Sequence, residues 1–216
     1  MSFTKGDNHL LDLSQAYKIT LDTGWDVPPG VLHAPASMCT YEPQFASDVY
    51  AMYQSVLYGG HCVPENLLWK NCPPEEIGNY DYLMDVIDWE ANVDPEFSKN
   101  RFMKPKVITE NEDYCEEWIC YKCPTVSAKR LTVNPGKTVV IKDMAAYGFI
   151  LVEGKGKIDG WDMETPTLIR YGSLTSDEFF VTEEAAKRGV TITNTSATEP
   201  IVMLKHFSEN PELVVE

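Results

Sequence analysis

Two histidines and a glutamate in the first third of the sequence could together hold a metal ion. His33 follows a Pro-Pro-Gly turn, Glu42 lies on a strand-like run, and His61 follows two glycines. One carboxylate and two imidazoles suit Mn, Fe, Ni or Zn and leave positions open for a substrate. The alternative is that His33 makes a local hydrogen bond, His61 is a loop residue and Glu42 lies on the surface.

Other polar side chains are candidates for ligand binding. Gln44 and Cys39 could face the same cavity as Glu42. Asp177 begins an acidic-aromatic cluster, and carboxylates beside aromatic rings can bind sugar hydroxyls. With 33 acidic residues in the chain, however, such clusters also arise by chance on a solvated face.

His206 lies in the last strand-like run, at residues 201–207. Alternation along a strand would put Lys205 and Phe207 on one face, and His206 with Leu204 on the other. This arrangement favours a core or interface histidine, although a ligand contact is a second interpretation.

Three of the six cysteines lie close together in sequence, and Cys120 and Cys123 have the spacing of zinc ligands. No second Cys or His pair lies near Cys115, Cys120 and Cys123 in the sequence to complete a zinc site. Free, reduced thiols in a cytoplasmic protein are therefore the favoured interpretation. The first residues contain no apolar segment typical of a secretory signal, which gives the same expectation.

Composition excludes several classes of function. The 216 residues carry 18 basic and 33 acidic side chains, a formal charge of −15. Binding to nucleic acid needs clustered basic residues, so we expect no nucleic-acid partner. No apolar run is long enough to span a bilayer, so we expect no membrane partner. A small-molecule ligand is the partner that remains.

Recurring short apolar runs position these residues. Between residues 118 and 208, runs of four to eight residues are bounded by Gly, Pro and Asn turns, a pattern typical of an all-β protein with a few short helices. We divide the chain into a β segment at 1–61, an irregular insertion with one short helix at 62–117, and a barrel at 118–216. In the first part, strands are expected at 17–21, 38–42 and 49–57.

Three stretches resemble the cupin superfamily. Residues 24–33 read GWDVPPGVLH, similar to the second cupin motif, in which Pro-x-Gly precedes a metal-binding His. Residues 149–156 resemble the Gly-rich ribbon of the family, and residues 194–200 its closing turn. The resemblance implies a double-stranded β-helix, the jelly-roll barrel, with His33 as the first metal ligand.

The sequence also departs from the family. Residues 141–148, which end in Tyr147 and Gly148, stand where the first motif would have two His and a Glu, and residues 182–185 stand where the second His would fall. The C-terminal barrel therefore lacks the usual metal ligands. The chain starts only 32 residues before His33, which leaves no room upstream for the first motif and its ribbon. We therefore expect either a degenerate two-barrel cupin or the C-terminal part of a longer one.

Two functions follow from the resemblance. The first is a metal-dependent isomerase for a sugar or sugar phosphate, with His33, Glu42 and His61 on the metal and Glu42 moving the proton of an enediolate. The alternative is a non-catalytic module without metal, for binding a small molecule or for dimerisation. Ligand contacts are expected from Gln44, Tyr147, Asp177 and His206. Exposed strand edges and an incomplete N-terminal half predict a homodimer.

Overall fold

The computed structural model describes residues 6–35, 37–46, 51–166, 168, 171–209 and 212. The chain divides into two compact units, each built from non-consecutive segments. Unit 1 comprises Met1–Thr20, Pro29–Ala34 and Ala46–Pro95, and unit 2 comprises Leu21–Pro28, Pro35–Phe45 and Glu96–Glu216. Among the described residues, no helix combines the length and the apolar character needed to cross a bilayer.

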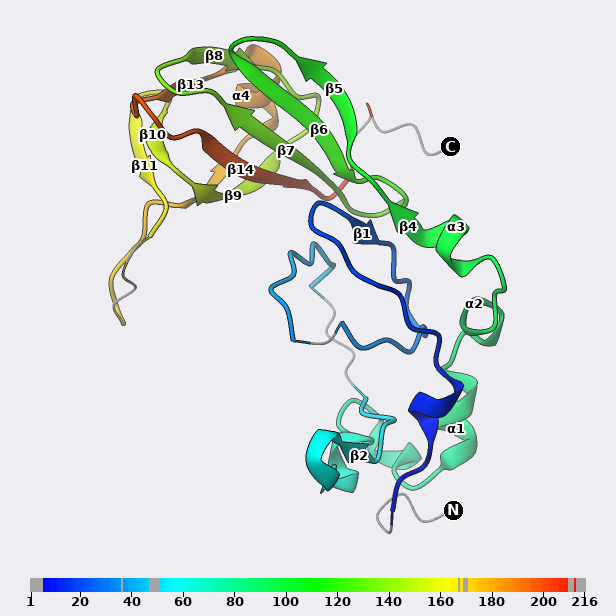
Figure 1. Ribbon diagram of the computed structural model, residues 1–216. Helices are drawn as coiled ribbons and strands as arrows, with labels where there is room; N and C mark the ends of the chain where they lie inside the picture. The colour runs from blue at the N-terminus through cyan, green and yellow to red at the C-terminus, as the bar shows by residue number, and fades with distance from the viewer. Residues whose placement is uncertain are drawn as a thin grey trace. The chain divides into compact units, whose positions relative to one another are not determined.

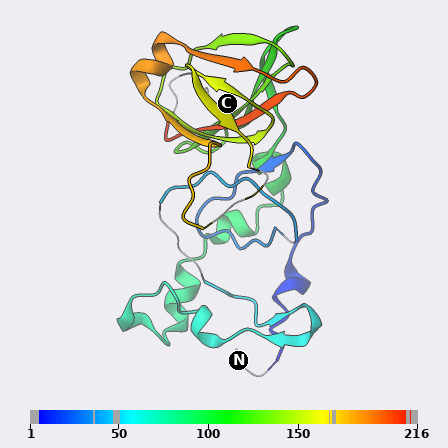
Figure 2. The ribbon, with the colours of Figure 1, turned by 90° about the vertical axis from the view of Figure 1, so that its left-hand side faces the viewer.

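Unit 2 contains two antiparallel sheets that curve around a common interior (Figures 1 and 2). The four-stranded sheet has the order β11 (Trp161–Glu164), β10 (Lys155–Ile158), β13 (Val190–Asn194), β8 (Thr138–Ile141). The six-stranded sheet has the order β12 (Glu178–Val181), β9 (Tyr147–Glu153), β14 (Ile201–Phe207), β7 (Ser127–Val133), β6 (Tyr114–Cys120), β5 (Lys106–Glu110). Two short strands, β1 (Gly24–Trp25) and β4 (Phe102–Met103), form a separate antiparallel pair. Strand β4 directly follows helix α3 (Phe97–Arg101) in the chain.

The strand order of β7 to β14 is that of a jelly roll. Strands β7 and β14, β8 and β13, β9 and β12, and β10 and β11 pair as the two arms of one long antiparallel ribbon. The pairings of β9 with β14 and of β10 with β13 roll this ribbon into two facing sheets. Double-sheet jelly rolls with this eight-stranded arrangement include the cupins. The predicted fold class is confirmed, and the six-stranded sheet begins at Lys106, earlier than the predicted barrel boundary.

Alternating side chains explain why these segments become strands of a barrel. Along β14, every second residue from Ile201 to Phe207 is buried, and β13 follows the same pattern. The buried side chains of the two sheets form one core, in which each large apolar residue contributes roughly 1.5–3 kcal/mol through burial. Its largest fully buried apolar side chains include Tyr147, Phe149, Leu131, Leu151, Met163, Ile192, Ile201 and Met203.

The turn between β9 and β10 requires glycine. Gly154 has a φ of 85°, and a Cβ at this position would lie 2.2 Å from the carbonyl oxygen of Pro200. A side chain would therefore be both strained and excluded by the neighbouring backbone. This close approach gives the predicted Gly-rich ribbon its physical basis.

Helix α4 (Glu183–Arg188) occupies the segment where the second cupin histidine would be expected. Thr182 caps its first turn by accepting a hydrogen bond from the amide of Ala185. Acidic residues lie in the first turn and basic residues in the last, which matches the helix dipole, and Gly189 ends the helix.

Unit 1 contains short elements around a small core of Leu68, Trp69 and Leu83. Where one short helix was predicted, the chain forms a 3-10 turn, η4 (Pro74–Glu76), and a separate helix, α1 (Tyr80–Asp85). The extended Ile77 separates the two, and Asn79 caps α1. The remaining elements are η1 (Leu10–Leu13), β2 (Val56–Leu57), η2 (Tyr58–Gly60), β3 (His61–Cys62), η3 (Glu65–Leu67) and α2 (Trp89–Asn92).

Two strand predictions in the first part of the chain are wrong. Residues 17–21 and 38–42 have no strand pairing, and a strand needs a neighbour for its backbone groups. In the predicted strand at 49–57, residues 49 and 50 lie outside the described residues, and only Val56–Leu57 forms a strand, β2.

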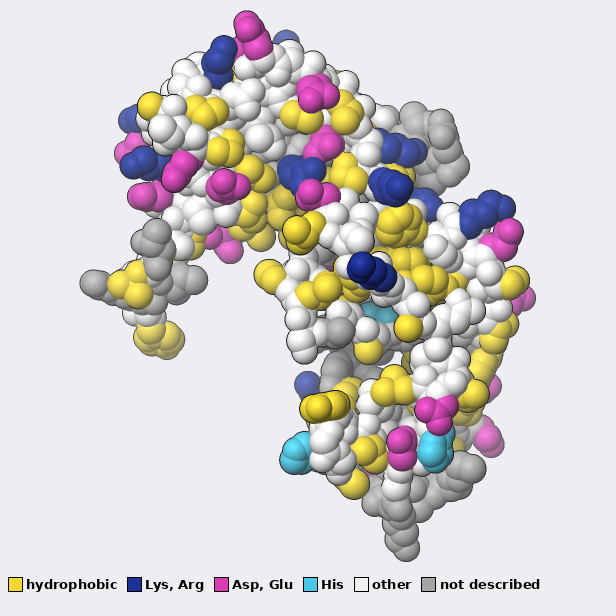
Figure 3. All heavy atoms as spheres, in the orientation of Figure 1, with side chains coloured by type: hydrophobic (Ala, Val, Ile, Leu, Met, Phe, Trp, Pro, Cys, Tyr) yellow, Lys and Arg dark blue, Asp and Glu magenta, His cyan; other side chains and the backbone are white. Residues whose placement is uncertain are grey.

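Basic and acidic side chains are mixed on the face of the barrel that Figure 3 shows. Arg130 on β7 is an example: it donates to Glu117 on β6 at 2.7 Å and also pairs with Asp22. Asp26 pairs with Arg101 at 2.6 Å. These ion pairs attach residues 21–28 to strand β7 and to the end of helix α3 in the same unit.

Candidate functional site

Four buried charged side chains form an ionic network inside the barrel. The Nζ of Lys129 lies 2.7 Å from Oδ1 of Asp143, and the Nζ of Lys205 lies 2.8 Å from its Oδ2. Lys205 also pairs with Oε1 of Glu116 at 2.5 Å. All four side chains are at most 8% exposed. We call Glu116, Lys129, Asp143 and Lys205 the ionic network.

Strand register places the members of this network together. Lys129 on β7 and Lys205 on β14 are direct cross-strand partners, and Trp118 on β6 is opposite Lys129. Asp143 follows β8, and its backbone amide donates to the carbonyl of Ala186 in α4. One carboxylate can therefore accept from two ammonium groups that would otherwise repel each other across the ladder.

Electrostatics favour the charged forms of Asp143 and Lys129. Burial alone would raise the pKa of Asp143, but the ammonium groups of Lys205 and Lys129 hold it below its usual range. Burial likewise opposes charge on Lys129, yet the carboxylates of Glu116 and Asp143 raise its pKa above the usual value. Lys129 also lies 4.7 Å from the Trp118 ring centroid, a distance that permits a cation–π contact.

Two hydroxyl groups beside the network have no hydrogen-bond partner among the described residues. They are Tyr147 Oη and Ser127 Oγ, on side chains that are 1% and 0% exposed. Ser127 is opposite Phe207 in the ladder, and the Phe207 ring lies 5.3 Å from the Tyr147 ring. Burial raises the pKa of Tyr147, so its hydroxyl stays protonated and able to donate. Buried polar atoms normally have a partner, so these two are candidates for contact with a bound molecule.

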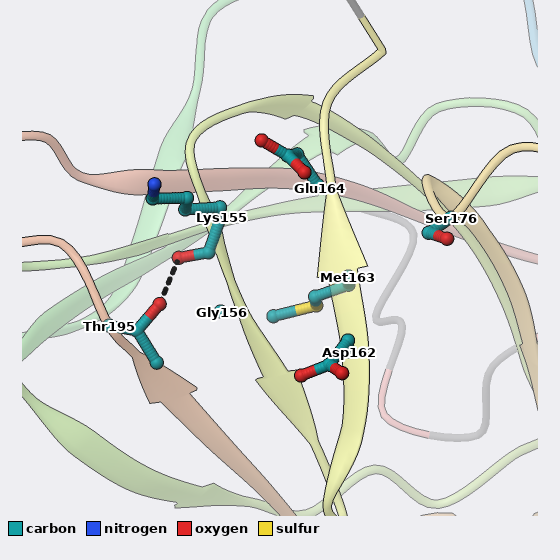
Figure 4. A pocket seen from close by; sticks show the side chains of 7 residues that line it. All are labelled: Lys155, Gly156, Asp162, Met163, Glu164, Ser176 and Thr195. Carbon is teal, nitrogen blue, oxygen red and sulfur yellow. Dashed lines mark hydrogen bonds between the residues drawn. The ribbon is translucent and has the colours of Figure 1, made fainter.

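A second polar site is a depression of about 280 Å³ on the ribbon formed by β10 and β11. Figure 4 shows its lining side chains, with Thr195 Oγ1 donating to the carbonyl of Lys155 at 3.4 Å. Two of the lining residues, Glu164 and Ser176, form an isolated bridge. Its walls are lined by Lys155, Gly156, Asp162, Met163, Glu164, Ser176 and Thr195.

Asp177 directly follows this depression in the chain. Its carbonyl accepts from Leu151, the side chain is 9% exposed, and Oδ1 has no partner among the described residues. The depression itself is open, and most of its lining side chains are exposed.

His206 lies on the outer face of β14, as strand alternation predicted. Its Nδ1 is 3.1 Å from the hydroxyl of Tyr41, so Tyr41 contacts this face of the strand. Burial lowers the pKa of His206, which favours the neutral imidazole. Gly148 lies against the ring, and a Cβ there would be 2.3 Å from Nε2. The histidine is therefore held away from the interior where Lys205 and Phe207 lie.

The predicted metal ligands are distributed over the two units. His33 and His61 belong to unit 1, and both are exposed; the Nδ1 of His33 lies 2.9 Å from the carbonyl of Val31. Glu42 and Gln44 belong to unit 2 and are exposed, and Glu42 accepts from Thr40 at 2.7 Å. Within the described part of the chain, no three His, Cys, Asp or Glu side chains are grouped as a metal site would require. The set of His33, Glu42 and His61 stays a prediction.

All six cysteines are free thiols. Burial and the nearby Cys123 raise the pKa of Cys120 to about 12.

Sequence reasoning selected Tyr147 but missed the ionic network around it. The signal was present: alternation puts Lys129 on the same face of β7 as Leu131 and Val133, and Lys205 on the same face of β14 as Phe207. A lysine in a run of inward-facing residues indicates a buried ion pair, because an unpaired buried ammonium is too costly.

No family model matches the sequence, and no curated protein sequence matches it. Similar solved structures include an RmlC-like cupin from Shewanella frigidimarina, 14% identical, with a TM-score of 0.35 over 50% of this chain and 86% of that chain. Rhodobacter sphaeroides SigE in complex with the anti-sigma ChrR is 10% identical, with a TM-score of 0.35 over 46% of each chain.

A variant of Bacillus subtilis oxalate decarboxylase is 18% identical, with a TM-score of 0.34 over 47% of this chain and 27% of that chain. This chain therefore spans less than half the length of the SigE–ChrR chain and about a quarter of the decarboxylase chain. The jelly-roll assignment rests on the strand order of unit 2 itself.

Proposed function

We propose that this protein is a cupin-like module that binds a small polar molecule in its barrel, and that this binding needs no metal in the barrel. The ionic network supports the proposal. Asp143 and Tyr147 lie in the segment that, by resemblance, stands where the first cupin motif has its metal ligands. There, the carboxylate of Asp143 is already bound by two lysine ammonium groups.

The chemistry of the network favours binding over catalysis. A general base needs a carboxylate free to take a proton near neutral pH, whereas both oxygens of Asp143 accept from ammonium groups and its pKa is lowered. The hydroxyls of Tyr147 and Ser127 are the groups that can still contact a ligand. The metal-dependent sugar isomerase, with His33, Glu42 and His61, is the alternative that the same experiment tests.

The test is elemental analysis of protein purified without a metal-affinity tag, before and after incubation with Mn, Fe, Ni or Zn. We expect no stoichiometric metal and no change in melting temperature on adding EDTA. About one metal per chain, by analogy with a single cupin centre, that is lost in His33→Ala but retained in His9→Ala would overturn the proposal and support the isomerase. His9 is an exposed histidine and serves as the matched control.

A further inference from the structure

A third carboxylate reaches the ionic network from outside the barrel strands. Glu212 follows β14 in sequence, and its Oε2 accepts from the Nζ of Lys129 at 3.0 Å. The Glu212 side chain is 38% exposed, whereas Lys129 is 1% exposed. The buried ammonium group of Lys129 thus binds a carboxylate that is itself partly open to solvent.

The charge balance of the network does not depend on Glu212. Two ammonium groups, on Lys129 and Lys205, face two buried carboxylates, on Glu116 and Asp143. If Glu212 leaves, Lys129 keeps its ion pair with Asp143, and no buried charge becomes unpaired. The carboxylate of Glu212 can therefore be exchanged for another carboxylate of the same charge.

The unpartnered hydroxyls lie on the same side of the barrel as Lys129. Ser127 and Lys129 are both inward-facing residues of β7, and the Nζ of Lys129 is 5.6 Å from the Phe207 ring. That ring contacts Tyr147. In the structure, neither the Tyr147 nor the Ser127 hydroxyl bonds to Glu212. A molecule with one carboxylate and one further polar group could bind the ammonium group of Lys129 and also hydrogen-bond to the hydroxyl of Tyr147 or Ser127.

Building on the proposed function, we infer that the barrel binds a small hydroxy acid. Its carboxylate takes the place of Glu212 at Lys129, and its hydroxyl group bonds to Tyr147 or Ser127. Glu212 is then an internal competitor of the ligand, because the chain supplies the same chemical group to the same ammonium. A competitor tethered to the site reduces the apparent affinity for the ligand, which scales with the fraction of time that the site is free.

The test uses the full chain with Glu212→Gln and measures the binding of glycolate by calorimetric titration. We expect the variant to bind glycolate roughly tenfold more tightly than the unmodified protein, because the competing charge is gone. Glu209→Gln removes the same charge at an exposed position of the same segment and should leave the affinity unchanged. Glycolamide, which lacks the carboxylate, should not bind. Equal affinity of the folded Glu212→Gln variant and the unmodified protein would overturn the inference.

The hydroxyl contacts are tested with Tyr147→Phe and Ser127→Ala, combined in the Glu212→Gln background. These changes remove unpartnered hydroxyls, so the fold should persist, and the affinity for glycolate should fall more than that for acetate. Unchanged glycolate affinity in the folded variant would contradict these contacts. Failure of glycolate to bind to metal-free protein refutes this inference alone, whereas a stoichiometric metal refutes the proposed function.

Discussion

Asp143 is the residue on which the two buried lysines depend. Lys129 and Lys205 face each other across β7 and β14, and Asp143 supplies one oxygen to each ammonium group. Removing one partner of a buried ion pair leaves a charge without compensation, which costs far more than the pair itself contributes. The carboxylate of Asp143 therefore matters more for stability than any ion pair on the surface.

Asp143→Asn is expected to lower the free energy of unfolding by roughly 3–5 kcal/mol, because the amide neutralises neither lysine. Urea unfolding followed by circular dichroism measures the change. Asp162→Asn is the matched control, because Asp162 pairs with Lys157 at 3.0 Å while its side chain is 85% exposed. The control should change little. Equal losses of unfolding free energy in the two variants would show that the buried network contributes no more to stability than a surface ion pair.

Among the elements, the turn between β13 and β14 is fixed by one buried side chain. Asn194 donates from Nδ2 to the carbonyls of Val133 and Glu199, at 3.0 and 2.9 Å, and accepts from the amide of Ser196. The residue is 2% exposed. It therefore joins the end of β13 to β7 and to the start of β14.

Asn194→Ala should destabilise the protein by roughly 2 kcal/mol, since buried backbone groups would lose their partners. Thermal unfolding measures the effect. Asn134→Ala provides the comparison, because Asn134 makes one exposed side-chain bond, to the carbonyl of Glu112. A melting temperature of Asn194→Ala equal to that of Asn134→Ala would contradict the role assigned to Asn194.

The sequence predicts an element well when local signals determine it, and poorly when it depends on pairing with a distant segment. Alternation and turn residues predict β14 at its observed bounds, because both signals are local. The same alternation at residues 38–42 does not produce a strand, since pairing needs a neighbour that local sequence does not specify. The ionic network could be predicted only in part: alternation turns Lys205 inward, but its meeting with Asp143 and Glu116 depends on register between distant strands.

On the scale of the whole molecule, the network makes stability depend on pH at both extremes. The lowered pKa of Asp143 means that its contribution is complete above the unfolded pKa, about 4, and is lost as pH falls through the folded pKa. The raised pKa of Lys129 means that its contribution is complete below about 10.4 and is lost as pH rises through the folded value.

We therefore expect the stability difference between the unmodified protein and Asp143→Asn to be constant across neutral pH. It should shrink as the pH falls below about 4, because the carboxylate of Asp143 becomes protonated. Urea unfolding of both proteins at a series of pH values measures this difference. A difference that stays the same down to pH 2 would show that Asp143 does not carry the charge assigned to it.

The predicted homodimer stays a prediction, which light scattering can test.

The position of β14 has a consequence for synthesis of the protein on the ribosome. This strand lies between β7 and β9, yet it is made after every other strand of the barrel. Until it emerges, β7 and β9 both have open edges and Asp143 has only one of its two lysines. Unpaired edges in a nascent chain expose it to association with other chains. The barrel can therefore be completed only after its last strand has been made and has paired with both β7 and β9.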